Sequence, residues 1–241
     1  MISTTVARRK SEFSSGVQAG ITIAIGYFPV ALTFGLLAEQ TGLTLMETVM
    51  MSLFVFAGAS QYISLSLIAA GVGVLEIILT TFIVNIRHFL MSASLNEKVE
   101  KDSSWKRALC SFGITDETFS VASIKEGTVT TSYMFGLFLI SYSSWVINSG
   151  IGHVVGVNLP LVLQESMSIA LYALFIGLLV PSLKKHRKVI SLAAFAAIVN
   201  SLFTLTGWLS AGWSIVVATL SSSVMIEWIF TKWKLEVNQD E

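Results

Sequence analysis

Long stretches of the sequence contain no Asp, Glu, Lys or Arg. They cover residues 13–38, 48–75, 77–86, 127–164 and 189–226. An α-helix needs about 20 apolar residues to cross the hydrocarbon core of a bilayer, and several of these stretches are longer than that. Because lipid offers no hydrogen-bond partners to the backbone, membrane spans are either helices or strands of a closed barrel. Barrel strands alternate apolar and polar residues over about ten positions, whereas these stretches are continuously apolar. The sequence therefore predicts helical membrane spans.

Composition disfavours the other classes of protein. Charged residues make up 12% of the 241 residues and hydrophobic residues 54%, whereas soluble domains carry roughly 25% charged residues. Lys+Arg and Asp+Glu are balanced at 15 each, so no strongly basic face is available for nucleic acid. The single cysteine, Cys110, excludes a disulfide framework and a cysteine-rich metal site. We expect an integral membrane protein in contact with lipid, with no cofactor, metal or nucleic-acid partner.

The predicted fold class is an all-α polytopic membrane bundle of about seven spans, with one or more broken or re-entrant helices, forming a single domain over residues 1–241. The expected spans are about 16–38, 46–70, 74–95, 131–152, 160–181, 189–206 and 210–230. The stretch 108–126 is mixed in polarity, so it could be either a further span or a connection between spans.

Four groups of Lys and Arg predict the orientation, because positive charges are retained in the cytoplasm. They lie at 8–10, 98–107, 184–188 and 232–234. This pattern places both termini in the cytoplasm. Three expected spans separate the first two groups, and an odd number would put those groups on opposite sides. Either one early segment is broken or re-entrant, or the stretch 108–126 crosses the membrane.

A run of small and polar residues lies in the second apolar segment, at Gly58, Ala59, Ser60 and Gln61. Small residues allow helices to approach closely, and Ser or Gln can hydrogen bond across the contact. Alternatively, the helix breaks here and offers free backbone N–H groups to a carboxylate at a helix N-terminus. Both interpretations remain open at this point.

Asn85, Arg87 and His88 lie late in the third apolar segment. An ionisable residue within a span is costly and is a candidate functional residue. Asn85 and His88 are three residues apart and share a helix face, while Arg87 points elsewhere. Arg87 either contributes to a site or extends its side chain to the membrane interface. His88 is either a proton carrier, since its ordinary pKa is near neutrality, or a structural hydrogen-bonding residue.

Asp116 and Glu117 follow Thr115 in the mixed stretch. Acids in the first turn of a helix favour the positive end of its dipole, and Thr115 can cap that helix. The functional alternative makes one acid the counter-ion of Arg87, a proton site or a contact for a substrate ammonium group.

Proline and glycine positions carry further predictions. Pro29 lies inside the first apolar segment, where its missing N–H and its ring either kink the helix or break it. Gly152 and Gly156 are four residues apart, a spacing typical of close helix packing. The sequence contains no phosphate loop, zinc-protease motif or nucleophile elbow, so we do not expect an enzyme.

Four of these motifs together resemble AzlC-type permeases. They are Tyr27 to Ala38, Phe56 to Gln61, Asn85 to His88, and Thr115 to Thr118, and their order and spacing are similar to that family over nearly the whole chain. The resemblance implies the large subunit of an exporter of branched-chain amino acids in the cell inner membrane. It also implies a small AzlD-type membrane partner and secondary transport that is linked to protons.

The resemblance assigns no residue roles, so the site hypothesis rests on physical chemistry. The expected substrate-binding residues are Gly58, Ala59, Ser60, Gln61, Asn85 and Arg87. The expected proton or ammonium sites are His88, Asp116 and Glu117. An alternative hypothesis, motivated by the small-residue packing motifs, is a membrane scaffold or assembly subunit that transports nothing.

Overall fold

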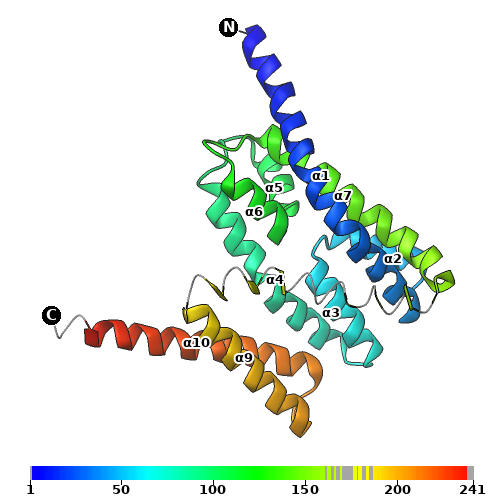
Figure 1. The fold of residues 1–241 in the computed structure, drawn as a ribbon, viewed down its shortest axis with the longest axis vertical. Coiled ribbons are helices and arrows are strands. Elements are labelled where there is room, and N and C mark those ends of the chain that lie inside the picture. Colours follow the sequence, from blue (N-terminus) through cyan, green and yellow to red (C-terminus); the bar gives the residue numbers. More distant parts are fainter. Residues whose placement is uncertain are drawn as a thin grey trace. The chain divides into compact units, whose positions relative to one another are not determined.

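The computed structural model consists of helices joined by short turns (Figure 1). It describes residues 2–160 and 187–237, and between them only positions 162, 163, 166, 169, 176, 177, 179, 180, 183 and 184. The elements are α1 (Ile2–Gln40), α2 (Leu45–Phe54), α3 (Gly58–Ala69), α4 (Val74–Asn96), α5 (Ser104–Phe112), α6 (Asp116–Ile124), α7 (Thr131–Val155), the 3-10 helix η1 (Gly156–Asn158), α9 (Arg187–Thr206) and α10 (Ala211–Val237).

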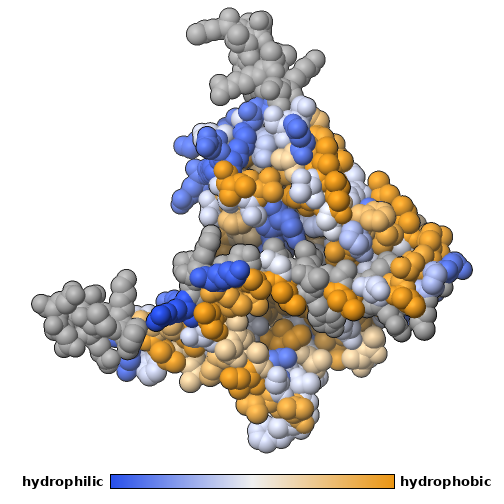
Figure 2. Space-filling model, viewed as in Figure 1, coloured by the Kyte–Doolittle hydropathy of each residue, from blue (hydrophilic) through white to orange (hydrophobic). Residues whose placement is uncertain are grey.

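Within the described residues, α1, α4, α7, α9 and α10 are long and apolar enough to cross a membrane. Large hydrophobic side chains cover much of the surface, as a lipid environment requires (Figure 2). The predicted all-α membrane fold is therefore confirmed. The expected span 160–181 lies almost wholly outside the described residues.

The second apolar segment is two helices and not one. α2 ends at Phe54 and α3 begins at Gly58, with Val55, Phe56 and Ala57 between them. Thr44 starts α2 with a capping box, in which its side chain accepts from the backbone N–H of Glu47 and its own N–H donates to the Glu47 carboxylate. The predicted break thus exists and lies just before the run of small residues.

The mixed stretch 108–126 also contains a break. α5 and α6 have nine residues each and are separated by a turn at residues 113–115. At 1.5 Å per residue, each covers about 14 Å, which is less than half of the roughly 30 Å hydrocarbon core. Neither helix can cross the bilayer by itself.

Pro29 does not break α1, so the sharper of its two interpretations is wrong. The helix is continuous from Ile2 to Gln40. The hydroxyl of Thr33 donates to the carbonyl oxygen of Pro29 at 2.9 Å, one turn further along. This bond reaches back one turn to a carbonyl and does not replace the one lost at the proline, whose missing N–H would have donated to the Ile25 carbonyl.

Contacts divide the chain into two compact units. The first comprises Met1–Leu65 and Val84–Ala170, and the second comprises Ser66–Ile83 and Leu171–Glu241. The boundaries therefore fall inside α3 and α4. The prediction of a single domain stays a prediction.

In the first unit, α1 and α7 lie side by side along most of their length (Figure 1). Glycines make this approach possible, because a side chain at these positions would collide with the other helix. A Cβ atom on Gly35 would lie 2.0 Å from the carbonyl oxygen of Ser149, and one on Gly152 would lie 2.1 Å from that of Leu32. Gly156 likewise meets Leu36. The predicted close packing at Gly152 and Gly156 is confirmed.

In the second unit, α9 and α10 form a hairpin, as the sequence predicts. The turn contains Gly207 with a φ of +66°, a conformation that side chains disfavour. The hydroxyl of Ser214 donates to the side-chain oxygen of Asn200 at 2.8 Å and ties the helices together. The carboxylate of Glu76 accepts from the backbone N–H groups of Gly212 and Trp213, so it caps the N-terminus of α10.

Candidate functional site

The break between α2 and α3 is held by a chain of buried hydrogen bonds around Gln61. The indole N–H of Trp145 donates to the Gln61 side-chain oxygen at 3.0 Å, and the Gln61 amide donates to the Ser52 hydroxyl at 3.2 Å. Ser52 in turn donates to the hydroxyl of Ser149 at 2.9 Å. Gln61, Ser52 and Ser149 are fully buried. These bonds join α2 and α3 to α7.

The same tryptophan accounts for Gly58. A Cβ atom on Gly58 would lie 2.8 Å from the ring of Trp145, so this position has no room for a side chain. Gly58 and Gln61 therefore both serve the contact with α7. The small-residue run begins at a helix break and also makes a packing contact. Each of its two interpretations therefore describes part of the structure.

Ser60 and Asn85 are brought together, as the site hypothesis requires. The Asn85 amide donates to the Ser60 hydroxyl at 3.0 Å, and Ser60 donates to the carbonyl oxygen of Ala57 at 2.9 Å. The side-chain oxygen of Asn85 is buried and has no hydrogen-bond partner within the described part of the chain. Buried polar atoms are nearly always paired, so this oxygen is a free acceptor for a ligand donor.

We expect Trp145→Phe to destabilise the protein by about 1–3 kcal/mol, because it leaves the Gln61 oxygen buried without a donor. The phenyl ring retains most of the aromatic packing. Thermal unfolding in detergent would measure the loss. Trp208→Phe is the matched control, since Trp208 is 81% exposed and should tolerate the change. Equal melting of both variants would contradict the structural role of the Trp145 N–H.

Arg87 and Asp116 form an ion pair across 2.9 Å. The pair joins α4 to the first turn of α6, and both side chains are partly buried, at 35% and 25% exposure. Among the alternatives raised by the sequence, Asp116 is therefore the counter-ion of Arg87. The Nε of Arg87 is buried and has no hydrogen-bond partner among the described residues. The guanidinium thus retains one donor for a further acceptor.

The first turn of α6 carries a second cluster, centred on Tyr27 of α1. Thr115 caps α6, accepting from the backbone N–H of Thr118 while its own N–H donates to the Thr118 hydroxyl. The Tyr27 hydroxyl donates to the Glu117 carboxylate at 2.6 Å and lies 2.7 Å from the Thr115 hydroxyl. Tyr27 is 4% exposed. Glu117 makes no ion pair with any described cation.

Tyr27 also connects the two polar clusters. Its ring meets the ring of Trp145 edge to face, with centroids 5.3 Å apart, and Trp145 donates to Gln61. The sequence analysis did not predict a role for Tyr27. The available signal was its place beside Pro29 in a motif of the family resemblance, but no local pattern indicates a partner 90 residues away.

His88 has a local hydrogen bond only. Its Nδ1 lies 3.3 Å from the backbone oxygen of Asn85 in the preceding turn of α4. This contact fits the structural alternative raised above. A proton-carrying role for His88 stays a prediction.

Long apolar helices surrounding buried, hydrogen-bonded polar groups define a polytopic helical membrane protein. The chain belongs to the AzlC family: the family model described as AzlC protein matches residues 22–159. Membrane transport is the activity of this family.

Several relatives agree with this assignment. The inner membrane protein YgaZ of Escherichia coli is 34% identical over 81% of this chain and 82% of its own length. A membrane protein of Archaeoglobus fulgidus is 30% identical over 91% of this chain and 96% of its own. The branched-chain amino acid transport protein AzlC of Bacillus subtilis is 24% identical over 74% of this chain and 70% of its own. No solved structure matches the chain.

Proposed function

We propose that the protein exports branched-chain and related neutral amino acids, namely valine, leucine, isoleucine and methionine. In this proposal, export is secondary transport linked to protons, and it requires a small AzlD-type membrane subunit. The protein would lie in the cell inner membrane with both termini in the cytoplasm. Family membership and the printed name of the Bacillus subtilis relative support the substrate class.

The observation that carries the proposal is the Arg87–Asp116 ion pair beside the Tyr27–Glu117 hydrogen bond. A neutral amino acid carries one carboxylate and one ammonium group, so its site needs a cation and an anion in a partly dry environment. Arg87 supplies the cation and Asp116 or Glu117 the anion. A charged side chain in a membrane protein is a candidate for ligand binding when it is partly buried and still has a donor or acceptor without a partner.

The pair can exchange partners without leaving a charge unpaired. As the substrate carboxylate approaches Arg87, the substrate ammonium group approaches Asp116, and one ion pair becomes two. The free side-chain oxygen of Asn85 can accept from the ammonium group. In this proposal, Ser60, Gln61 and the backbone at Gly58 and Ala59 shape the site, and the hydrogen bonds of Ser60 and Gln61 hold α3 in place.

Glu117 and His88 are the proposed proton sites. Glu117 accepts a hydrogen bond from the Tyr27 hydroxyl and has no cationic partner among the described residues. Acidic and histidine side chains inside membrane proteins are candidates for proton relays.

We expect cells that produce this protein together with the small partner to release loaded valine, leucine, isoleucine and methionine faster than cells that lack it. Loading with dipeptides containing these residues provides the internal pool, and the external concentrations give the rate. Glycine from a loaded dipeptide is the matched control, because it has no apolar side chain. Unchanged efflux of every amino acid tested, with and without the partner, would overturn the proposal.

A further inference from the structure

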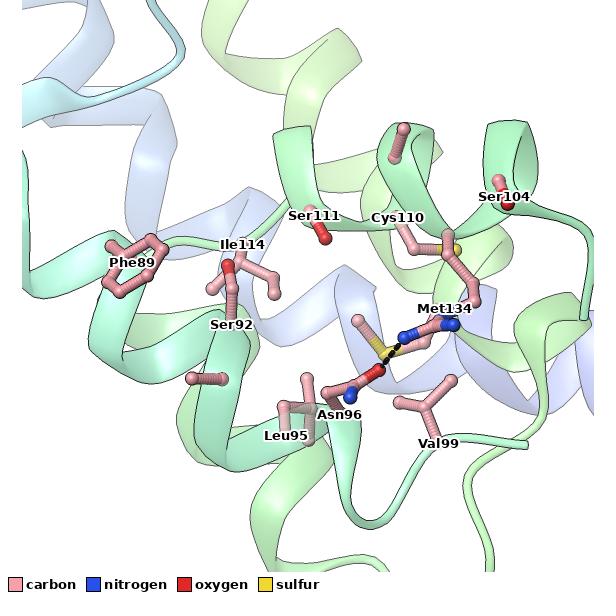
Figure 3. Close-up of a pocket in the computed structure, with 13 residues that line it drawn as sticks. Phe89, Ser92, Leu95, Asn96, Val99, Ser104, Cys110, Ser111, Ile114 and Met134 are labelled. Carbon is pink, nitrogen blue, oxygen red and sulfur yellow. Dashed lines mark hydrogen bonds between the residues drawn. The ribbon is translucent and has the colours of Figure 1, made fainter. Parts of the chain in front are cut away.

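The first compact unit contains a cavity of about 370 Å³ that the proposed transport site does not use (Figure 3). It lies between the C-terminal part of α4, α5 and the start of α7. Binding sites for small molecules begin at about 300 Å³, so this cavity suits a ligand of amino-acid size. Arg87 and Asp116 are not among its lining residues.

One part of the cavity wall is apolar. Phe89 and Leu95 contribute from α4, Ile114 from the turn before α6, and Met134 from α7. Leu95, Ile114 and Met134 are themselves buried. Such a wall favours an apolar tail, because removing the CH₂ groups of a ligand from water is favourable.

Among the described lining residues, the polar ones include a cation and no acid. Arg107 and Asn96 line the cavity, and a guanidinium N–H of Arg107 donates to the Asn96 side-chain oxygen. The nearby acids Glu100 and Asp102 do not line it. Glu100 accepts from the backbone N–H of Thr131, and Asp102 accepts from the Thr131 hydroxyl and pairs with a lysine of α5. Arg107 thus lines the cavity with guanidinium donors beyond the one that reaches Asn96, and it forms no ion pair with any described acid, which suits an anionic head group.

We propose that this cavity binds a small carboxylate with an apolar tail, held by Arg107 and Asn96 at its head and by Ile114 and side chains of α4 and α7 along its tail. Leucine and its deaminated analogue 4-methylpentanoate both have this chemistry. The proposal concerns binding and does not depend on transport by the Arg87 site.

Cys110 gives a direct measurement, because it lines the cavity and is the only cysteine of the chain. Burial, followed by the nearby carboxylates of Asp102 and Glu100, raises the pKa of its thiol to about 11. Only the thiolate reacts with N-ethylmaleimide, so we expect the alkylation rate to rise about tenfold per pH unit between pH 8 and pH 10. The test is therefore made at pH 9, on the full-length protein in detergent.

We expect leucine or 4-methylpentanoate to slow the alkylation of Cys110. At ten times the Kd, about one site in eleven is empty, so the rate should fall about tenfold. Arg107→Ala should abolish this protection, while Lys101→Ala, which removes an exposed charge outside the cavity, should retain it. Protection by both compounds, or by 4-methylpentanoate alone, supports the proposed carboxylate site. Protection by leucine alone would contradict it, because recognition of the ammonium group needs an acid that the described lining residues do not include.

A second variant tests the cavity itself. Ala93→Leu adds bulk to a lining residue and should also abolish protection. A bound ligand raises the melting temperature of the unaltered protein, and we expect no such rise in Ala93→Leu. If neither compound protects Cys110 or raises the melting temperature of the unaltered protein, the proposal is wrong. If protection persists in folded Arg107→Ala, the assignment of the head-group site is wrong. Either result leaves the proposed export intact, because export is measured separately.

Discussion

Arg87→Ala is expected to reduce amino-acid export by about 10- to 150-fold. The change removes the cation that is proposed to bind the substrate carboxylate, and a hydrogen bond to a charged group contributes about 1.5–3 kcal/mol. Each 1.4 kcal/mol corresponds to a factor of ten, which gives the expected range. The measurement is efflux from loaded cells at equal amounts of protein in the membrane. Asp116→Asn should have a similar effect, since it removes the other half of the pair.

The control variants separate transport from assembly. Arg87→Lys keeps the positive charge but loses the planar fork of donors, so we expect partial activity. The exchange Arg87→Asp with Asp116→Arg restores the ion pair with its direction reversed. We expect it to recover stability but not export, because the substrate would meet each charge on the wrong helix.

A scaffold subunit would behave differently. Arg87→Ala and Asp116→Asn should then keep both the complex with the partner and its function. Loss of export from an intact complex would support the transporter, whereas unchanged export by a folded Arg87→Ala would contradict the role proposed for the pair.

Gly35→Ala is expected to destabilise the protein by about 1–3 kcal/mol or more, the usual range for overpacking. The added Cβ atom would lie 2.0 Å from the Ser149 carbonyl oxygen and 2.5 Å from the His153 nitrogen. Both are backbone atoms of α7, so no side-chain rotation relieves the collision and the two helices must separate. Thermal unfolding in detergent measures the effect.

Gly26→Ala is the matched control in the same helix. A Cβ atom at Gly26 would meet nothing within 4 Å, and alanine is better than glycine in a helix by about 1 kcal/mol. We therefore expect this variant to be as stable as the unaltered protein or more so. Similar melting temperatures for Gly35→Ala and Gly26→Ala would contradict the close backbone contact of α1 with α7 at Gly35.

Much of the fold could be predicted because its main signal is local. Uncharged runs of sufficient length identify membrane helices, and the turn between α9 and α10 was predicted to within one residue, although α10 extends seven residues beyond the expected end. The breaks were harder to predict, because they depend on tertiary partners. Pro29 offered a break in α1 as one interpretation, and that break does not occur. The break before Gly58 lies beside a contact with Trp145, a residue far away in the sequence.

The candidate site could be predicted only in part, for the same reason. Arg87 and Asp116 were each singled out, since charges beside apolar runs are conspicuous, and their pairing was one of several alternatives. Tyr27 was missed, because a tyrosine in an apolar helix is unremarkable until its partner is known. That partner, Glu117, lies 90 positions away, and no periodicity in the sequence connects the two.

The glycine contacts along α1 and α7 have a mechanical consequence. Two helices that approach backbone to backbone at several glycines share a long, close contact, so we expect α1 and α7 to move as one unit. The hydroxyl of Tyr27 connects the first turn of α6 to this unit by hydrogen bonds. Hydrogen bonds can open and re-form without repacking a helix interface. In a transport cycle, we therefore expect α6 to change its position relative to α1 and α7 before those two helices separate.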